Sequence, residues 1–328
     1  MVTLEAIRQP VERDLQAFDA FVAQNISAEG ELLSDMLRYA LSSRGKGIRP
    51  TIVMLSAALN APRGVAAGRR VHLAAMLVEM IHVASLIHDD VIDESDTRRG
   101  RPSVNARWQS HRAVLLGDYI LARNLSIGMS SGQYDLVTHV CNSMATLCEG
   151  EALQSDCAAR HDMTRRDYFD IIHKKTASLI AVSASAGAMA AGASQERVAL
   201  MHRFGEAVGM AFQIQDDILD YTRTAHTGKP ANNDLREGKI TLPLLAVLER
   251  TDGDRRRELL AKLASCGRDE AAVEYLQRIV ENGGGLTAAA EVMRGYLAKA
   301  TDMLAGYEAC PARSALADLC LYIAERDR

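Results

Sequence analysis

Two short acidic clusters of identical pattern are the residues of this chain best suited to chemistry. They read DDVID and DDILD, and they begin at Asp89 and Asp216. In an α-helix, residues four positions apart lie on one face, with their Cβ atoms about 5 to 6 Å apart. We therefore expect Asp89 to lie beside Asp93, and Asp216 to lie beside Asp220.

Paired carboxylates of this kind are typical of a site for a hard divalent cation. Two like charges at that spacing destabilise a helix unless a cation lies between them. Mg²⁺ takes oxygen ligands, keeps several waters and shares its remaining positions with phosphate oxygens. A single acidic run is more often the solvated end of a helix. Because the pattern occurs twice, each time at the end of a long apolar segment, we favour the metal interpretation for Asp89, Asp93, Asp216 and Asp220.

The segments that lead to the two clusters differ from ordinary amphipathic helices. Residues 71–87 are almost entirely apolar, and the exceptions Glu79, His82 and Ser85 recur at about every third position. Such a helix is buried on all sides except along a thin polar stripe. Residues 203–221 repeat this plan. The two polar stripes indicate a shared internal cavity.

The composition and the hydrophobic pattern predict an all-α protein. Only 5% of the residues are aromatic, and no run of alternating polar and apolar residues is long enough to build a sheet. Short clusters of turn residues separate the helical segments, at 42–50, 96–104, 222–238 and 283–285. A helix over 51–60 is expected to begin after Pro50. Because none of the breaks resembles an interdomain linker, we expect one domain over residues 1–328.

The charge and the cysteines argue against several classes of protein. A formal net charge of -4 and a pI near 6.2 do not suit a nucleic-acid-binding surface. The six cysteines form no C-x-x-C pair, which leaves a zinc site or a disulfide framework unsupported and fits a reduced compartment. The first residues lack the apolar core of a signal peptide, so we expect a cytoplasmic protein.

One uncharged stretch must be weighed as a membrane span. Residues 176–193 contain no charged side chain, but they consist mainly of Ala, Ser and Gly with few large aliphatic residues. Insertion of such a segment into a bilayer would be only weakly favourable. Small residues at this density let helices pack closely, so we expect a helix inside a soluble bundle and no stable membrane insertion.

Four motifs, in this order, carry a resemblance to a known family: LIHDDVIDESDTRRGRPSVN, VLLGDYILAR, FQIQDDILD and GKPANNDLREGKITLP. With them the chain resembles a trans-isoprenyl diphosphate synthase of the polyprenyl synthetase family, from Gly45 to the segment around Pro243. The resemblance implies the isoprenoid synthase fold, an antiparallel helical bundle around a deep central cavity, usually as a homodimer. It also implies three Mg²⁺ ions per active site and two substrates, isopentenyl diphosphate and an allylic diphosphate.

Two diphosphates need basic side chains in addition to metal ions. By resemblance, the isopentenyl diphosphate contacts four residues: Lys46, Arg49, His82 and Arg99. The allylic diphosphate contacts Arg98, Lys229 and Lys239 in the same way. The chain departs from the family pattern at one turn, because many members carry Gly at position 44 and a basic residue at position 47, where this chain has Arg44 and Gly47.

The resemblance also places Lys175, Thr176 and Gln213 beside the reacting carbons. Oxygen dipoles there would stabilise an allylic cation, so neither a Ser or Cys nucleophile nor an acid–base pair is required. Arg326 and Arg328 at the end of the chain are interpreted as part of a frayed tail rather than of the isopentenyl site.

The length of the product depends on what closes the cavity below the first cluster. Ala84 and Ser85 lie about 6 to 7.5 Å below Asp89 along the helix, and both are small. In short-chain relatives, bulky aromatic residues occupy these places. The next candidates for a floor follow: Met80, Ile81, Met76, Ile127 or Met129. We therefore predict an all-trans product of roughly six to ten isoprene units, with four units as the alternative.

Two other functions are compatible with parts of this pattern. A terpene cyclase shares the fold and the first acidic cluster, but its second metal motif is normally of an Asn/Ser/Glu type, and it lacks the pocket formed by Lys46, Arg49 and Arg99. A non-catalytic subunit of a heteromeric synthase tends to lose one acidic cluster. This chain retains both clusters, so we favour an active prenyltransferase.

Overall fold

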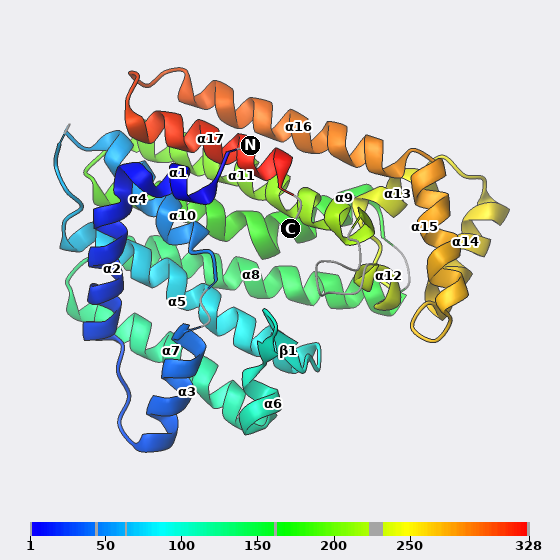
Figure 1. Ribbon diagram of the computed structural model, residues 1–328, viewed down its shortest axis with the longest axis horizontal. Coiled ribbons are helices and arrows are strands. Elements are labelled where there is room, and N and C mark those ends of the chain that lie inside the picture. The colour runs from blue at the N-terminus through cyan, green and yellow to red at the C-terminus, as the bar shows by residue number, and fades with distance from the viewer. Residues whose placement is uncertain (1, 43–44, 63, 161–162, 223–231, 327–328) are drawn as a thin grey trace.

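The computed structural model describes residues 2–42, 45–62, 64–160, 163–222 and 232–326, and in these ranges the chain is almost entirely helical (Figure 1). The elements are α1 (Leu4–Arg8), η1 (Gln9–Val11), α2 (Glu12–Asn25), α3 (Glu31–Ser42), α4 (Ile48–Asn60), α5 (Arg69–Ile92), β1 (Thr97–Arg98), β2 (Arg101–Pro102), α6 (Val104–Trp108), α7 (Ser110–Ser130), α8 (Tyr134–Arg160), α9 (Arg165–Ile172), η2 (His173–Ala177), α10 (Ser178–Ala190), α11 (Gln195–Thr222), α12 (Asn233–Arg236), α13 (Leu242–Leu248), α14 (Gly253–Ser265), α15 (Glu270–Asn282), α16 (Gly285–Leu304) and α17 (Pro311–Glu325). The prediction of an all-α protein is confirmed.

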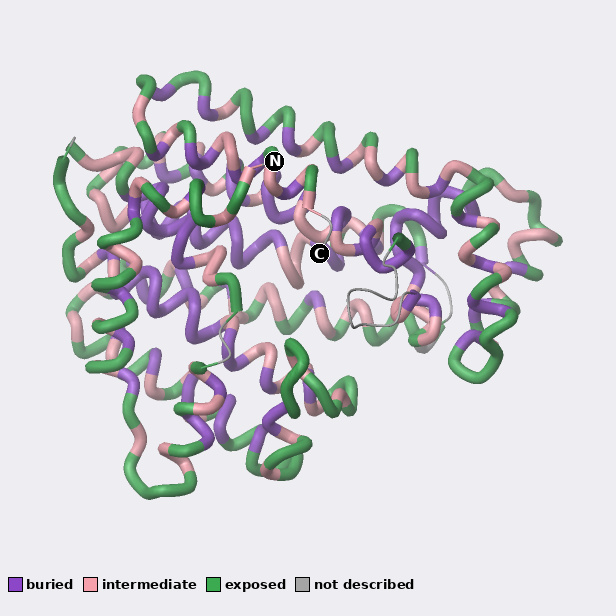
Figure 2. Tube along the Cα trace, viewed as in Figure 1, coloured by how far each residue is buried: buried purple, intermediate pink, exposed green. Residues whose placement is uncertain are grey.

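Helix α10 is the centre of the bundle. It packs against α4, α5, α8 and α11, and every residue from Ser178 to Ala188 is buried (Figure 2). Its small side chains let these neighbours approach closely, and the buried hydroxyls of Ser183 and Ser185 donate to carbonyls one turn earlier. The uncharged stretch predicted to pack inside a bundle therefore does so.

Helices α5 and α11 lead to the two acidic clusters. Both are long, and the last two turns of each carry the aspartates. Among the described residues, α5 is the one helix long and apolar enough to cross a membrane by length and composition, and 72% of its most apolar window is buried inside the protein. Helix α5 is therefore a buried core helix, as predicted from its almost entirely apolar sequence with a thin polar stripe.

Several element boundaries differ from those expected. Helix α4 begins at Ile48 rather than at residue 51, so that Pro50 lies inside the first turn, where a missing backbone N–H is tolerated. The break at 96–104 contains the hairpin β1–β2, which is antiparallel and pairs Thr97 with Pro102. Part of the break at 222–238 forms the short helix α12.

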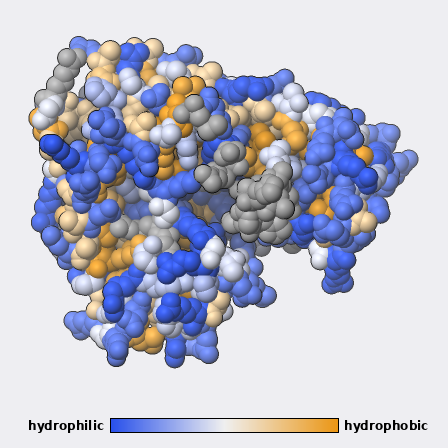
Figure 3. Space-filling view, in the orientation of Figure 1, coloured by the Kyte–Doolittle hydropathy of each residue, from blue (hydrophilic) through white to orange (hydrophobic). Residues whose placement is uncertain are grey.

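The end of the chain returns to the middle of the bundle. Helix α17 packs against α1, α4, α11 and α16, and Figure 1 shows that it ends near the centre of the view. In the space-filling view, this face is hollowed between the end of α17 and the C-terminal part of α5 (Figure 3). Helices α14 and α15 lie at one end of the bundle, away from this hollow.

Candidate active site

The first acidic cluster lies at the C-terminal end of α5. Asp93 is the residue that ends the helix, and its N–H donates to the carbonyl of Asp89, so the two residues are one helical turn apart, as predicted. Asp90 points the other way, is buried and accepts from Arg98 Nε at 2.8 Å. Asp89 and Asp93 therefore lie on a different side of the helix from the ion pair between Asp90 and Arg98.

The second cluster lies in the last two turns of α11. Asp216 is paired with Arg326, at 2.8 Å between the guanidinium and the carboxylate. Asp220 is buried, and its Oδ2 accepts the backbone N–H of Asp234 at 3.0 Å. Burial and the neighbouring Asp220 raise the pKa of Asp234 to about 7. Asp234 is an acidic neighbour that the sequence analysis did not single out.

A further carboxylate, Glu151 of α8, joins the first cluster. Burial, followed by the charges of Glu151 and Asp93, raises the pKa of Asp89 to about 6. Lys175 forms an ion pair with Glu151 at 2.7 Å and partly offsets this repulsion. Sequence reading missed Glu151 because it lies in an ordinary amphipathic helix, in no recognisable motif.

Lys239 interacts with carboxylates at the ends of both α5 and α11. It forms an ion pair with Glu237 at 2.5 Å, and although burial opposes its charge, Glu237, Asp93 and Asp234 together raise the pKa of Lys239. Asp93 follows α5, and Asp234 lies beside Asp220 of α11. Because Asp93 and Asp234 both act on this one ammonium group, the C-terminal ends of α5 and α11 border one site.

These side chains fit Mg²⁺ by their chemistry. They are hard oxygen donors, and burial, with neighbouring carboxylates as the second cause, raises the pKa values of Asp89 and Asp234. Within the described parts of the chain, no three acidic, histidine or cysteine side chains are already gathered closely enough to hold an ion alone.

Lys175 and Thr176 lie on a π-helical turn, η2, between α9 and α10. Turns of this kind occur often at functional sites, because the extra residue changes which side chains face a cavity. The Thr176 hydroxyl donates to Gln213 Oε1 at 2.8 Å. The three residues that the resemblance placed beside the reacting carbons thus come from two neighbouring elements, with Lys175 directed to Glu151.

A separate basic group lies between α4, α5 and the β1–β2 hairpin. Burial lowers the pKa of Arg49 to about 10, with the buried carboxylate of Glu79 opposing this effect. Arg49 Nε is buried and has no hydrogen-bond partner among the described residues. Burial, then Arg49 and Arg99, keeps the pKa of His82 well below its usual value, so this imidazole is neutral near pH 7. The group is therefore suited to bind an anion.

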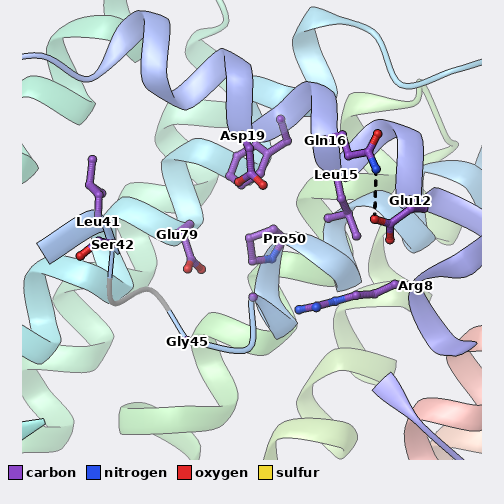
Figure 4. Close-up of a pocket in the computed structure, with 12 residues that line it drawn as sticks. Arg8, Glu12, Leu15, Gln16, Asp19, Leu41, Ser42, Gly45, Pro50 and Glu79 are labelled. Carbon is purple, nitrogen blue, oxygen red and sulfur yellow. Dashed lines mark hydrogen bonds between the residues drawn. The ribbon is translucent and has the colours of Figure 1, made fainter. Parts of the chain in front are cut away.

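Glycine and turn geometry place Arg99 in this group. Arg99 and Gly100 both have positive φ, at 54° and 74°, as the two-residue turn of a tight hairpin requires. Gly45 also has positive φ, and the Arg99 guanidinium lies where a Cβ of residue 45 would be. A side chain at position 45 would therefore displace Arg99. Beside this turn, a cavity of about 330 Å³ is lined by residues that include Glu79, Gly45 and Arg8 (Figure 4).

The remaining predicted basic residues have partners of their own. Lys46 is exposed and its Nζ donates to the Tyr322 hydroxyl at 3.2 Å. Arg98 binds Asp90, which holds it next to the first cluster. Lys229 lies outside the described residues, as does Arg328.

The interpretation of Arg326 as part of a frayed tail is wrong. Its side chain is 6% exposed, donates to the Phe212 carbonyl at 2.7 Å and lies over the Phe212 ring at 3.9 Å. Its own carbonyl accepts from Gln215 Nε2. The ion pair with Asp216 and the contacts with Phe212 therefore hold Arg326 against α11. The sequence offered no signal for this contact beyond a basic residue near the terminus.

The predicted floor residues lie along α5 below the first cluster. Ala84, Met80, Ile81 and Met76 are buried, whereas Ser85 is half-buried and its hydroxyl donates to the carbonyl of His82 at 3.0 Å. Ile127 is half-buried on α7. Met129, in contrast, is 48% exposed, which is wrong for the floor of an internal cavity within this chain.

Comparison with known proteins identifies the class to which this fold and site belong. Residues 30–281 match the sequence model of the family described as polyprenyl synthetase. The chain therefore belongs to the polyprenyl synthetase family, and its fold is the all-α isoprenoid synthase fold.

Individual relatives extend this similarity over the whole chain. Heptaprenyl diphosphate synthase component 2 of Geobacillus stearothermophilus is 37% identical over 327 residues, covering 99% of each chain. All-trans-nonaprenyl-diphosphate synthase (geranyl-diphosphate specific) of Rhodobacter capsulatus is 37% identical and covers 85% of each chain. The polyprenyl synthase of Caulobacter crescentus, solved with calcium and isoprenyl diphosphate, has a TM-score of 0.91 at 29% identity, covering 100% of this chain and 99% of that one.

The repulsion at Asp89 leads to a prediction about stability without metal. In EDTA, Asp89→Asn should raise the melting temperature, because it removes a carboxylate whose ionisation the folded state opposes. The folded pKa lies above the usual 3.8, so the gain should grow as the pH rises from about 4 to about 6 and level off above. Melting curves at pH 4.5 and pH 8 measure this difference.

The matched control is Asp135→Asn, which removes an exposed carboxylate paired with Arg70. This substitution should not raise the melting temperature at either pH. Equal gains for both variants, or no gain for Asp89→Asn at pH 8, would contradict the carboxylate repulsion described here.

Proposed function

We propose that this chain is a prenyltransferase that condenses isopentenyl diphosphate head to tail with an allylic diphosphate. The observation that carries the proposal is the division of one site into two parts. Asp93 after α5 and Asp234 beside Asp220 of α11 act on the same lysine, Lys239, and a separate group contains the guanidinium groups of Arg49 and Arg99 with the neutral imidazole of His82. One part suits a diphosphate bound through metal ions, and the other suits a second diphosphate bound directly.

The aspartates Asp89, Asp93, Asp216 and Asp220 are proposed to hold Mg²⁺, three ions per site. Bound there, the ions would neutralise the charge that develops on the leaving diphosphate. The structure of a similar synthase with calcium supports the use of a divalent cation.

The chain's own residues are proposed to act on three groups. Arg98, Lys229 and Lys239 neutralise the allylic diphosphate, whose carbon–oxygen bond breaks with its electron pair going to pyrophosphate. Lys46, Arg49, His82 and Arg99 hold the isopentenyl diphosphate so that its double bond forms the new carbon–carbon bond. Lys175, Thr176 and Gln213 border the allylic carbon, and pyrophosphate takes the proton whose loss restores an alkene.

The product is proposed to be a long all-trans chain of roughly six to ten isoprene units. Small residues at Ala84 and Ser85 leave room below the first cluster, and relatives named heptaprenyl and nonaprenyl diphosphate synthases support this range. Met80 and Ile81 are the proposed floor further down α5.

Product analysis tests the reaction and the length together. With Mg²⁺, isopentenyl diphosphate and allylic diphosphates of two, three or four units, the protein should give products well above four units. Ser85→Phe should shorten the products by at least one unit, because Ser85 is four residues before Asp89 on the same helical face. Chromatography of the dephosphorylated products measures both.

Ser314→Phe, on the exposed side of α17, is the control and should leave the product length unchanged. Absence of elongation with every primer would overturn the catalytic proposal and favour a non-catalytic subunit or a cyclase. A product that stops at four units would retain the reaction and reject the long-chain proposal.

A homodimer is proposed for the assembly, and the exposed face of α7 supports it. Val114, Leu125 and Met129 are exposed apolar residues that recur on one face of this helix, with Leu115 beside them at 62% exposure. A second copy of the chain would cover them. One relative is named as component 2 of its synthase, so a different partner chain is the alternative.

The α7 face can be tested by solution mass. Leu125→Glu should shift the purified protein from dimer to monomer in light scattering coupled to size-exclusion chromatography, since a buried unpaired carboxylate opposes association. Val65→Glu, at a residue 58% exposed between α4 and α5, should leave the dimer intact. A wild-type monomer, or a dimer that withstands Leu125→Glu, would reject this interface.

Two further properties are proposed from the sequence. Residues 1–328 are proposed to form a single domain, supported by one hydrophobic cluster that extends from Ile7 to Ile323. The protein is proposed to be cytoplasmic, without stable membrane insertion, which the burial of α5 supports.

The contact between Arg326 and Asp216 leads to a prediction about metal binding. If Asp216 is a metal ligand, its ion pair with Arg326 competes with the cation. Arg326→Met should therefore bind Mg²⁺ at least about threefold more tightly, which corresponds to the loss of one weak ion pair. Titration calorimetry in the presence of inorganic pyrophosphate measures this affinity without any reaction.

The same variant should melt at a lower temperature in EDTA, because its contacts with Phe212 are lost. Arg278→Met removes an exposed arginine of α15 and should change neither quantity. Unchanged or weaker Mg²⁺ binding by Arg326→Met would show that the ion pair does not compete with metal.

A further inference from the structure

A chain of three hydrogen bonds extends from the protein interior to the residues proposed to border the allylic carbon. The Tyr168 hydroxyl of α9 donates to Asp217 Oδ2 at 2.5 Å. Gln213 Nε2 donates to Asp217 Oδ1 at 2.9 Å, and the Thr176 hydroxyl donates to Gln213 Oε1 at 2.8 Å. Tyr168 and Asp217 are buried, at 3% and 4% exposure, while Gln213 and Thr176 are half-buried.

Asp217 therefore has a different task from its neighbour in the sequence. Asp216 is turned toward Arg326 and the site, whereas both carboxylate oxygens of Asp217 are engaged by Tyr168 and Gln213. A buried carboxylate without partners would be strongly unfavourable, so these two donors account for its presence in the interior. The middle aspartate of the second cluster is thus a structural acceptor.

The direction of the hydrogen bonds fixes the orientation of the Gln213 amide. Asp217 Oδ1 can only accept, so it selects the NH₂ end of the amide and turns the carbonyl oxygen toward Thr176. This orientation survives protonation of Asp217 on Oδ2, because Tyr168 can then accept while Oδ1 still accepts from Gln213. An amide free to turn over would present N–H groups in place of its oxygen half of the time.

The backbone holds the ends of this chain in place. Gly209 lies one turn before Gln213, and a Cβ at this position would be 2.5 Å from the Ala177 Cα of the π-helical turn. Helix α9 begins with a capping box between Thr164 and Asp167, directly before Tyr168. Thr176 and Tyr168, the two ends of this chain of hydrogen bonds, are therefore anchored on ordered elements.

We propose that Tyr168 and Asp217 are positioning residues that keep the oxygens of Gln213 and Thr176 directed at the carbon where positive charge develops. The inference rests on the proposed prenyl transfer, and it adds two residues to that reaction. Oxygen dipoles already oriented before the bond breaks stabilise a cation without reorganisation, and they act on the transition state more than on the bound substrate.

The first test separates kcat from KM. Tyr168→Phe should lower kcat about 3- to 10-fold, the effect of one hydrogen bond on the barrier, and leave KM for both substrates within about twofold. The control is Tyr307→Phe, which removes a hydroxyl that donates to Asn60 and should not change kcat. Equal kcat for Tyr168→Phe and the wild type would overturn the proposal, as would a rise in KM without a fall in kcat.

A double-mutant cycle distinguishes positioning from general destabilisation. Asp217→Asn should keep most of kcat, because the introduced amide can donate to Tyr168 and still accept from Gln213. In the Asp217→Asn background, Tyr168→Phe should reduce kcat by a larger factor than it does in the wild type. Without the Tyr168 hydroxyl, the amide introduced at position 217 can rotate by 180°, and the Gln213 amide would then rotate with it. Additive effects on kcat would reject the positioning proposal.

These experiments distinguish failure of the positioning proposal from failure of the proposed prenyl transfer. Failure of prenyl transfer would appear as a wild-type protein without elongation. Failure of the positioning proposal would appear as an active wild type whose Tyr168→Phe variant has the same kcat. Melting curves of each variant, measured alongside, identify any loss of activity that follows from unfolding.

Discussion

The crowding of partly buried carboxylates at the ends of α5 and α11 is the constraint on which the rest of this structure depends. Asp89 and Asp216 stand near helix C-termini, where the helix dipole also disfavours negative charge. Burial, followed by the charges of Glu151 and Asp93, raises the pKa of Asp89 to about 6. A fold that places acids in this way must derive its stability elsewhere and must supply cations from its own chain.

The central helix provides that stability. Helix α10 presents Ala, Ser and Gly to four neighbours, so that α5 and α11 are held by close backbone packing rather than by contacts at their acidic ends. The cations come from different parts of the chain: Arg98 from the hairpin, Lys175 from the π-helical turn and Arg326 from the end of α17. Arg98 pairs with Asp90, Lys175 with Glu151 and Arg326 with Asp216, and Lys175 and Arg98 also lower the pKa of Asp89.

The sequence was sufficient to predict an all-α fold, the two acidic clusters and the buried helices that carry them. These features follow from hydrophobic periodicity and from i to i+4 spacing, which are local properties of the chain. The contacts of Arg326, Glu151 and Tyr168 could not, because each joins residues far apart in the chain and none belongs to a motif. The π-helical turn also escaped prediction, because the helix that follows it is buried on all sides and has no amphipathic pattern whose phase could be seen to shift. Tertiary packing decides which charged side chains form ion pairs, and these pairs cannot be predicted from a single sequence.

The two adjacent aspartates of the second cluster show how one short motif can serve two environments. Consecutive residues on a helix point about 100° apart, so Asp216 and Asp217 face different neighbours although they are chemically the same. One meets a guanidinium at the edge of the site, and the other meets a phenol and an amide in the interior. A motif read only as a set of metal ligands would assign both the same role. Here the environment assigns each its own: one carboxylate is placed where it can share a cation, and the other orients the groups that surround the reaction.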